Sequence, residues 1–246
     1  MKHRNGRDVA AAVLFDIDGT LVDSNYHHVY AWCRAFADVG IAVDAWRIHR
    51  SIGMDGSTLL ATLAEDADDD TRARAKELNS RYYKETASLL RPLPGARGLL
   101  EAVEKLGIKV VLATSAPDDE LEILRDVLDC DHLVSAMTSS ADVDTAKPKP
   151  DIINIALGRA GVEAEHAVFV GDAVWDVEAC KRAGVVNIAL LSGGVSQCEL
   201  EQAGAHQVFV GVAGQHRHLG QCSIHLPLRL RQIVLAIDLV LSLIHI

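Results

Sequence analysis

The chain is predicted to be an α/β protein with a doubly wound, mainly parallel sheet, and three observations support this fold class. Short apolar runs at 11–15, 108–113, 167–170 and 186–191 have the length and composition of buried strands. Segments with helical patterns lie between them, and such alternation is typical of a parallel sheet with helices on both faces. Polar residues follow three of the runs, at the carboxyl edge where open α/β sheets place their chemistry.

The first run leads into Asp16-Ile17-Asp18-Gly19-Thr20, in which two carboxylates lie two residues apart. Two carboxylates crowded at one edge repel each other unless a cation or a shared proton lies between them. A Mg²⁺ site in which one carboxylate also attacks the substrate accounts for this pattern. Asp and Gly also favour turns for local reasons, so this segment alone leaves a plain turn open as the alternative.

Three later segments add polar residues in an order that resembles a known family. Thr114 and Ser115 follow the second run, Lys147 begins the sequence Lys-Pro-Lys-Pro-Asp, and Asp172 begins Asp-x-x-x-Asp after the third run. Together with the Asp-x-Asp-Gly-Thr segment they resemble the four motifs of the haloacid dehalogenase superfamily. The resemblance extends over residues 9–209 and is strongest to the phosphoglycolate phosphatases and β-phosphoglucomutases of subfamily IA.

The roles of these residues are implied by the resemblance. It implies that Asp16 is the nucleophile that becomes an aspartyl-phosphate, and that Asp18 acts as general acid and then as general base. The implied ligands of the phosphoryl group are Thr114, Ser115 and Lys147. The implied ligands of Mg²⁺ are Asp16, Asp18 (through its backbone carbonyl), Asp172 and Asp176. Asp176 is either a direct ligand or a carboxylate that orients waters or Lys147, and the first turn of a helix suits an acid in any case.

A long segment without strand patterns separates the first two apolar runs. Its patterns favour helices at 26–39, 56–65 and 70–90. A connection of this length needs structure of its own. The resemblance implies that residues 24–92 form a helical cap inserted into a Rossmann-like core of residues 1–23 and 93–212.

The cap contains candidates for substrate recognition. His28 resembles the histidine that lies near the acid and base of β-phosphoglucomutases, and a structural role in its helix is the alternative. Gly53, Met54 and Asp55 lie in the loop that, by resemblance, faces the cleft. This loop lacks the arginine with which the mutases hold a second phosphate. We therefore expect a phosphatase that hydrolyses a small phosphorylated metabolite. A phosphomutase is the nearest alternative, and an inactive scaffold or binding protein is a further one.

Composition bears on compartment and partners. The net charge is −10 and no Lys/Arg-rich run occurs, which disfavours nucleic-acid binding. Five scattered cysteines and an N-terminus without an apolar signal segment favour a reduced, cytoplasmic enzyme. Residues 213–246 differ in composition from the rest, and we interpret them as a frameshift or read-through product. Charged residues interrupt their apolar stretch, so we expect no membrane span. The sequence does not indicate the oligomeric state.

Overall fold

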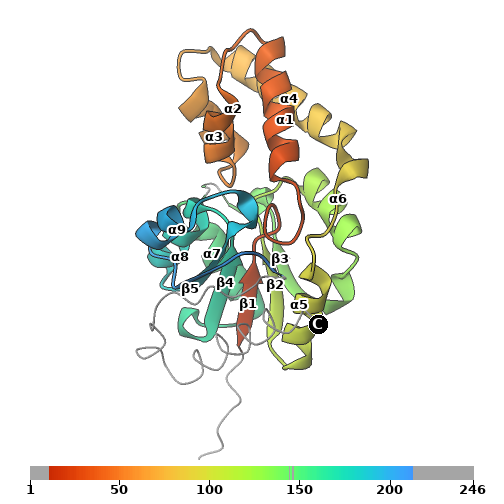
Figure 1. Ribbon diagram of the computed structural model, residues 1–246, viewed down its shortest axis with the longest axis vertical. Coiled ribbons are helices and arrows are strands. Elements are labelled where there is room, and N and C mark those ends of the chain that lie inside the picture. Colours follow the sequence, from red (N-terminus) through yellow and green to blue (C-terminus); the bar gives the residue numbers. More distant parts are fainter. Residues whose placement is uncertain (1–10, 144, 146, 213–246) are drawn as a thin grey trace, which may run out of the picture.

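A computed structural model of the chain describes residues 11–143, 145 and 147–212. The expectation for residues 213–246 therefore lies outside the described residues. The described part has a six-stranded sheet in the order β3-β2-β1-β4-β5-β6, and all neighbouring strands are parallel (Figure 1). The strands are β1 (Ala12–Phe15), β2 (Lys109–Ala113), β3 (Val134–Thr138), β4 (Ala167–Gly171), β5 (Val186–Leu190) and β6 (Gln207–Phe209).

Helices cover both faces of this sheet, which confirms the predicted doubly wound α/β fold. They are α5 (Ala96–Lys105), α6 (Asp118–Leu128), α7 (Asp151–Ala160), α8 (Val174–Ala183) and α9 (Gln197–Ala203). Successive side chains of a strand point to opposite faces. Thus Val13 and Phe15 of β1 pack into the cluster that includes α5 and α6, whereas Leu14 packs with α7. Burial on both faces explains why this strand is apolar at every position.

Four predicted strands correspond to β1, β2, β4 and β5, whereas β3 was not predicted. β3 lies at one edge of the sheet, beside β2. Its sequence, Val-Ser-Ala-Met-Thr, contains a single aliphatic β-branched residue, and most of its side chains are only partly buried. A partly exposed edge strand does not need the continuous apolar run that identified the central strands.

Four helices form a separate unit at the carboxyl edge of the sheet, above it in Figure 1. They are α1 (Asn25–Asp38), α2 (Ala45–Ser51), α3 (Gly56–Leu63) and α4 (Asp69–Glu85). The helices predicted at 26–39 and 56–65 correspond to α1 and α3. The helix predicted at 70–90 is α4, which ends at residue 85 before a short 3₁₀ turn. The seven-residue α2 was not predicted because it buries only Ile48 and Ser51.

The chain crosses between the helical unit and the sheet twice, and the two crossings lie side by side. The backbone N–H of Asp23 donates to the carbonyl of Arg91 at 2.9 Å, and that of Leu93 donates to the carbonyl of Leu21 at 2.8 Å. These paired crossings place α1 and α4 directly above the end of β1. Within the described ranges, no helix has both the length and the apolar character that a bilayer crossing requires.

Candidate active site

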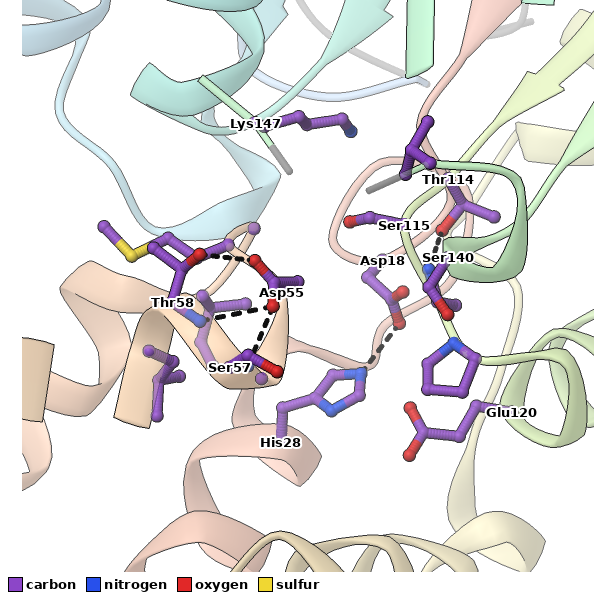
Figure 2. A pocket seen from close by; sticks show the side chains of 18 of the residues that line it. Asp18, His28, Asp55, Ser57, Thr58, Thr114, Ser115, Glu120, Ser140 and Lys147 are labelled. Carbon is purple, nitrogen blue, oxygen red and sulfur yellow. Dashed lines mark hydrogen bonds and ion pairs between the residues drawn. The ribbon is translucent and has the colours of Figure 1, made fainter. Parts of the chain in front are cut away.

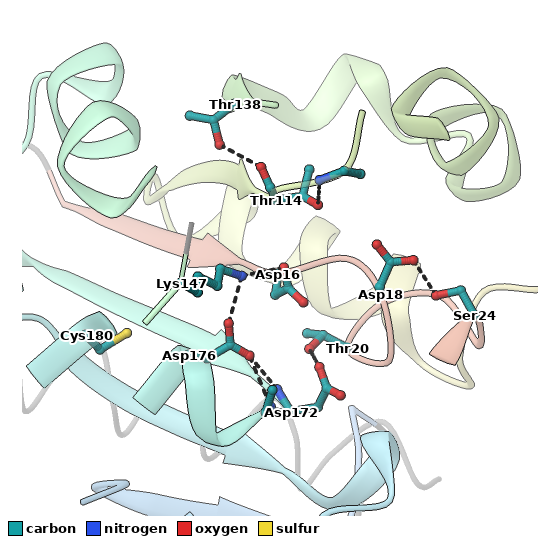
Figure 3. A network of polar contacts seen from close by, with 12 residues as sticks. Asp16, Asp18, Thr20, Ser24, Thr114, Thr138, Lys147, Asp172, Asp176 and Cys180 are labelled. Atoms are coloured by element: carbon teal, nitrogen blue, oxygen red, sulfur yellow. Dashed lines mark hydrogen bonds and ion pairs between the residues drawn. The ribbon is translucent and has the colours of Figure 1, made fainter. Parts of the chain in front are cut away.

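Three carboxylates meet where β1 and β4 end. Asp16 follows β1, Asp172 follows β4, and Asp176 lies in the first turn of α8. β1 and β4 are parallel neighbours, so the residues that follow them lie close together. Carboxylate oxygens of the three residues lie within 4.8 Å of one another, and all three residues are buried (Figure 3). The sequence prediction of an acidic site at this edge thus corresponds to a compact cluster.

Lys147 is the cation of this cluster. Its Nζ lies 2.8 Å from Oδ1 of Asp16 and 2.7 Å from Oδ1 of Asp176, and the residue is 1% exposed (Figure 3). Burial lowers the pKa of Lys147, but the two adjacent carboxylates outweigh burial and raise that pKa above its ordinary value. Lys149, the second lysine of the motif, is exposed. The structure therefore places Lys147, and not Lys149, among the carboxylates.

Asp176 has both carboxylate oxygens engaged within the protein. Its Oδ1 faces Lys147, and its Oδ2 accepts the backbone N–H groups of Asp172 and Ala173 at 3.2 and 3.1 Å. An acid in the first turn of a helix commonly accepts such N–H groups. Asp176 therefore fixes the turn that carries Asp172.

Asp172 is held by two side chains from the first third of the chain. Its Oδ1 accepts the hydroxyl of Thr20 at 2.9 Å, and its Oδ2 accepts the amide of Asn25 at 2.8 Å. Sequence reasoning did not identify Asn25, which begins α1. The contact joins residues 147 positions apart, and no local pattern could have indicated it.

The cluster carries more negative than positive charge. Burial raises the pKa of Asp16 to about 7, with added repulsion from Asp176 and Asp18 against the opposing effect of Lys147. Burial and repulsion from Asp176 and Asp16 raise the pKa of Asp172 well above its ordinary value. A divalent cation would relieve this repulsion, and carboxylate oxygens are the ligands that Mg²⁺ prefers. The donor set therefore fits Mg²⁺.

Asp18 points away from the three-carboxylate cluster toward α1. Its Oδ1 accepts the Ser24 hydroxyl at 2.5 Å (Figure 3) and lies 3.1 Å from Nε2 of His28 (Figure 2). Burial raises the pKa of Asp18, but the charge and hydrogen bond of His28 outweigh burial and hold that pKa below its ordinary value. Burial lowers the pKa of His28, but the charge and hydrogen bond of Asp18 outweigh burial and hold that pKa above its ordinary value. The His28 ring stacks on Tyr83 of α4 with centroids 4.1 Å apart.

A cavity of about 800 Å³ lies between the sheet edge and the helical unit. Most of the residues singled out from the sequence line it, namely Asp16, Asp18, His28, Gly53, Met54, Asp55, Thr114, Ser115 and Lys147. Asp172 and Asp176 do not line it and contact Asp16 and Lys147 from the side of β4. The structure thus brings nearly all candidates into one pocket.

Two of these candidates have their side chains occupied by local structure. Asp55 is the N-cap of α3, and its carboxylate accepts the N–H groups of Ser57 and Thr58 at 2.8 and 3.2 Å (Figure 2). The Thr114 hydroxyl accepts the N–H of Ala116 at 3.0 Å. These bonds fix the loops that border the pocket.

Sequence reasoning also missed two buried polar residues that line the pocket, Glu120 and Asn79. Glu120 is 5% exposed and lies in the first turn of α6, and Asn79 is 7% exposed and lies on α4. An acid in the first turn of a helix is common without any function, so the sequence offered no specific signal for Glu120. Asn79 lies in a polar helix whose pattern does not distinguish a residue that faces a cavity.

Fold and site together define the class of protein. A parallel α/β sheet whose carboxyl edge holds clustered carboxylates and a buried lysine, beneath a polar pocket, is an enzyme core suited to an anionic group. The model of the haloacid dehalogenase-like hydrolases matches residues 10–184, and the chain belongs to this family.

Relatives and solved structures agree with this assignment. A phosphoglycolate phosphatase of Rhodospirillum rubrum is 31% identical over 85% of this chain and 90% of its own length. A phosphorylated carbohydrates phosphatase of Thermotoga maritima is 34% identical over 72% of this chain and 83% of its own. A crystal structure of a hydrolase from Pseudomonas syringae has a TM-score of 0.78 and 36% identity, and covers 81% of this chain and 93% of that one. The chain is therefore an enzyme, a hydrolase of the phosphatase type.

Proposed function

We propose that the chain is a Mg²⁺-dependent phosphatase that hydrolyses a small phosphorylated metabolite through an aspartyl-phosphate on Asp16. The observation that carries this proposal is the position of Asp16, which lines the pocket while Lys147 and two further carboxylates surround it. A covalent intermediate divides one difficult displacement into two easier ones.

In the first step an oxygen of Asp16 bonds to phosphorus, and the bond between phosphorus and the ester oxygen breaks. His28 favours the ionised form of Asp18 in the free protein, so Asp18 must take up a proton when the substrate binds. It gives this proton to the departing oxygen, and the alcohol leaves neutral. In the second step water attacks the phosphorus, Asp18 accepts a proton from that water, and inorganic phosphate leaves Asp16. The bonds from His28 and Ser24 orient the Asp18 carboxyl for both proton transfers.

Asp16, Asp172 and the backbone carbonyl of Asp18 would hold the Mg²⁺. The ion, when bound, neutralises charge on the phosphoryl group and on the attacking carboxylate. Because both oxygens of Asp176 are engaged by Lys147 and by backbone N–H groups, we assign Asp176 to positioning rather than to direct coordination. Thr114, Ser115 and Lys147 would bind the phosphoryl oxygens, with Lys147 supplying the positive charge.

The helices of residues 24–92 would act as a cap over the pocket. Two contacts join these helices to the part of the chain that contains the sheet. Lys84 of α4 pairs with Asp119 of α6 at 2.5 Å, and Nε2 of His49 in α2 lies 2.8 Å from the carbonyl of Gly193. A closed cap excludes bulk water from the reaction, and its opening releases product. Gly53 and Met54 of the cap loop face the pocket and would contact the substrate.

The cap loop at residues 53–55 favours hydrolysis over transfer to a second sugar. A mutase must hold a second phosphate, but Gly53 and Met54 offer no cation and the Asp55 carboxylate is occupied as an N-cap. A mutase would form glucose 6-phosphate from glucose 1-phosphate in the presence of a bisphosphate activator. We expect no such product. An inactive scaffold would show no turnover at all.

The test is the release of inorganic phosphate from a panel of phosphorylated metabolites, with Mg²⁺ and with EDTA. We expect Mg²⁺-dependent release that Asp16→Asn abolishes while the protein stays folded by circular dichroism. The matched control is Asp126→Asn, which makes the same change at an exposed site of α6 and should retain activity. Turnover retained by Asp16→Asn would refute Asp16 as the nucleophile.

A further inference from the structure

Two buried side chains that line the pocket have no part in the chemistry proposed above. Glu120 and Asn79 are both more than nine-tenths buried. Among the described residues, no group hydrogen-bonds the Glu120 carboxylate, and Nδ2 of Asn79 has no acceptor. Buried polar groups are nearly always hydrogen-bonded, so the unpaired amide of Asn79 calls for an explanation, and the Glu120 carboxylate lines the cavity without a partner from the described part of the protein. Because both face a cavity, a ligand in that cavity is the simplest partner for each.

Glu120 lies near the position of the leaving group. In Figure 2 its carboxylate lies beside the His28 ring, on the side of the pocket that holds Asp18. It is close enough for both residues to act on its ionisation: burial raises the pKa of Glu120 to about 7, His28 opposes this rise and Asp18 adds to it. Since Asp18 is proposed to protonate the departing oxygen, the atoms bonded to that oxygen would lie next to Glu120.

Asn79 lines the same pocket from α4. It precedes Tyr83 by four residues, and residues four apart share a face of a helix. Tyr83 stacks on His28, so this face of α4 covers the same part of the pocket. Lys76, one turn before Asn79, also lines the pocket and donates to Ser57 at 3.3 Å. The α4 wall thus presents donors, whereas the α6 wall presents an acceptor, Glu120.

We propose that Glu120 and Asn79 form a subsite that binds the alcohol portion of the substrate and favours hydroxylated over carboxylated phosphate esters. This inference rests on the proposed phosphatase function. A hydroxyl group can donate to Glu120 and accept from Asn79, so a substrate with several hydroxyls satisfies both walls. A carboxylate only accepts hydrogen bonds when ionised. Beside the ester oxygen it would face the Glu120 carboxylate, and above about pH 7, where Glu120 is ionised, the two like charges repel.

A pair of substrates with the same length separates the two classes. 2-Hydroxyethyl phosphate and 2-phosphoglycolate differ only in whether the terminal carbon is an alcohol or a carboxylate. At pH 8, where Glu120 is ionised, we expect kcat/KM for the alcohol to exceed that for the acid by about tenfold or more, because like charges oppose binding of the acid. The variant Glu120→Gln should narrow this ratio at least about fivefold, mainly through a lower KM for phosphoglycolate. The matched control is Glu122→Gln at an exposed site of α6, which should leave the ratio unchanged.

Asn79→Leu tests the contribution of α4. With glycerol 1-phosphate, which carries two hydroxyls, kcat/KM relative to that for p-nitrophenyl phosphate should fall by about tenfold, the value of one hydrogen bond to a buried group. Folding of each variant is checked by its melting temperature.

The outcomes separate failure of the subsite from failure of the phosphatase. If wild-type protein prefers phosphoglycolate, or if folded Glu120→Gln and Asn79→Leu leave both ratios unchanged, the subsite is overturned. If wild-type protein with Mg²⁺ hydrolyses neither p-nitrophenyl phosphate nor any ester of the panel, the phosphatase function itself is overturned.

Discussion

The stability of the folded protein should depend on pH through Glu120, and Glu120→Gln isolates this dependence. Glutamine has nearly the same shape as glutamate but does not ionise in this range. Glu120 is 5% exposed, and burial is the largest cause that raises its pKa from 4.5 to about 7. The folded protein therefore resists ionisation of this carboxyl, whereas the unfolded chain does not.

The sign and size of the effect follow from proton linkage. Below about pH 4.5 the carboxyl is protonated in both states, and it contributes no pH dependence. Between pH 4.5 and 7 the unfolded chain loses the proton while the folded protein keeps it, so the free energy of unfolding falls as the pH rises. The difference between 4.5 and about 7 corresponds to a loss of about 3 kcal/mol, complete above pH 7. Glu120→Gln avoids this loss.

The assay is urea unfolding of wild type and Glu120→Gln in EDTA at pH 5, 6, 7 and 8. The variant minus wild-type difference in the free energy of unfolding should increase by about 2–3 kcal/mol from pH 5 to pH 8. An effect of the substitution that does not depend on pH cancels when the differences at pH 5 and pH 8 are compared. For the control Glu122→Gln, the difference from wild type should be the same at both pH values. A difference that stays constant, or that decreases with pH, would refute the electrostatic reasoning for Glu120.

Three further substitutions test other parts of the structure. Lys147→Met should lower the free energy of unfolding by about 3–5 kcal/mol in EDTA, because it leaves buried carboxylates without their cation; unchanged urea unfolding would contradict this. Gly193→Ala should weaken Mg²⁺ binding by about 10-fold or more, since the added Cβ would collide with the Asp172 carboxylate. A titration with Mg²⁺ that follows activity or melting temperature measures this change. An unaltered titration would show that Mg²⁺ binding does not require the observed position of the Asp172 carboxylate. Gly158→Ala, in α7 with open space around its Cβ, should raise the free energy of unfolding by about 0.5–1 kcal/mol, and a decrease would contradict the helix-propensity argument.

The central strands could be predicted because burial on both faces leaves a plain pattern in the sequence. β1 is apolar at each position, and the polar residues that follow it identify the active edge. The edge strand β3 and the short helix α2 could not be predicted in the same way. Both are stabilised by only part of their surface, so their sequences lack a continuous or periodic apolar signal.

The sequence alone determined the family resemblance, the doubly wound α/β class and the residues that we propose for the reacting centre. These features reside in short contiguous motifs whose local order is retained on folding. Tertiary structure alone decided that Asn25 holds Asp172, that both oxygens of Asp176 are engaged, and that Glu120 and Asn79 face the pocket unpaired. Each of these contacts or vacancies depends on segments far apart in the chain, or on the side of a helix that faces a cavity. Packing decides which distant segments meet and which side of a helix faces the cavity, and neither outcome produces a recognisable pattern in the local sequence.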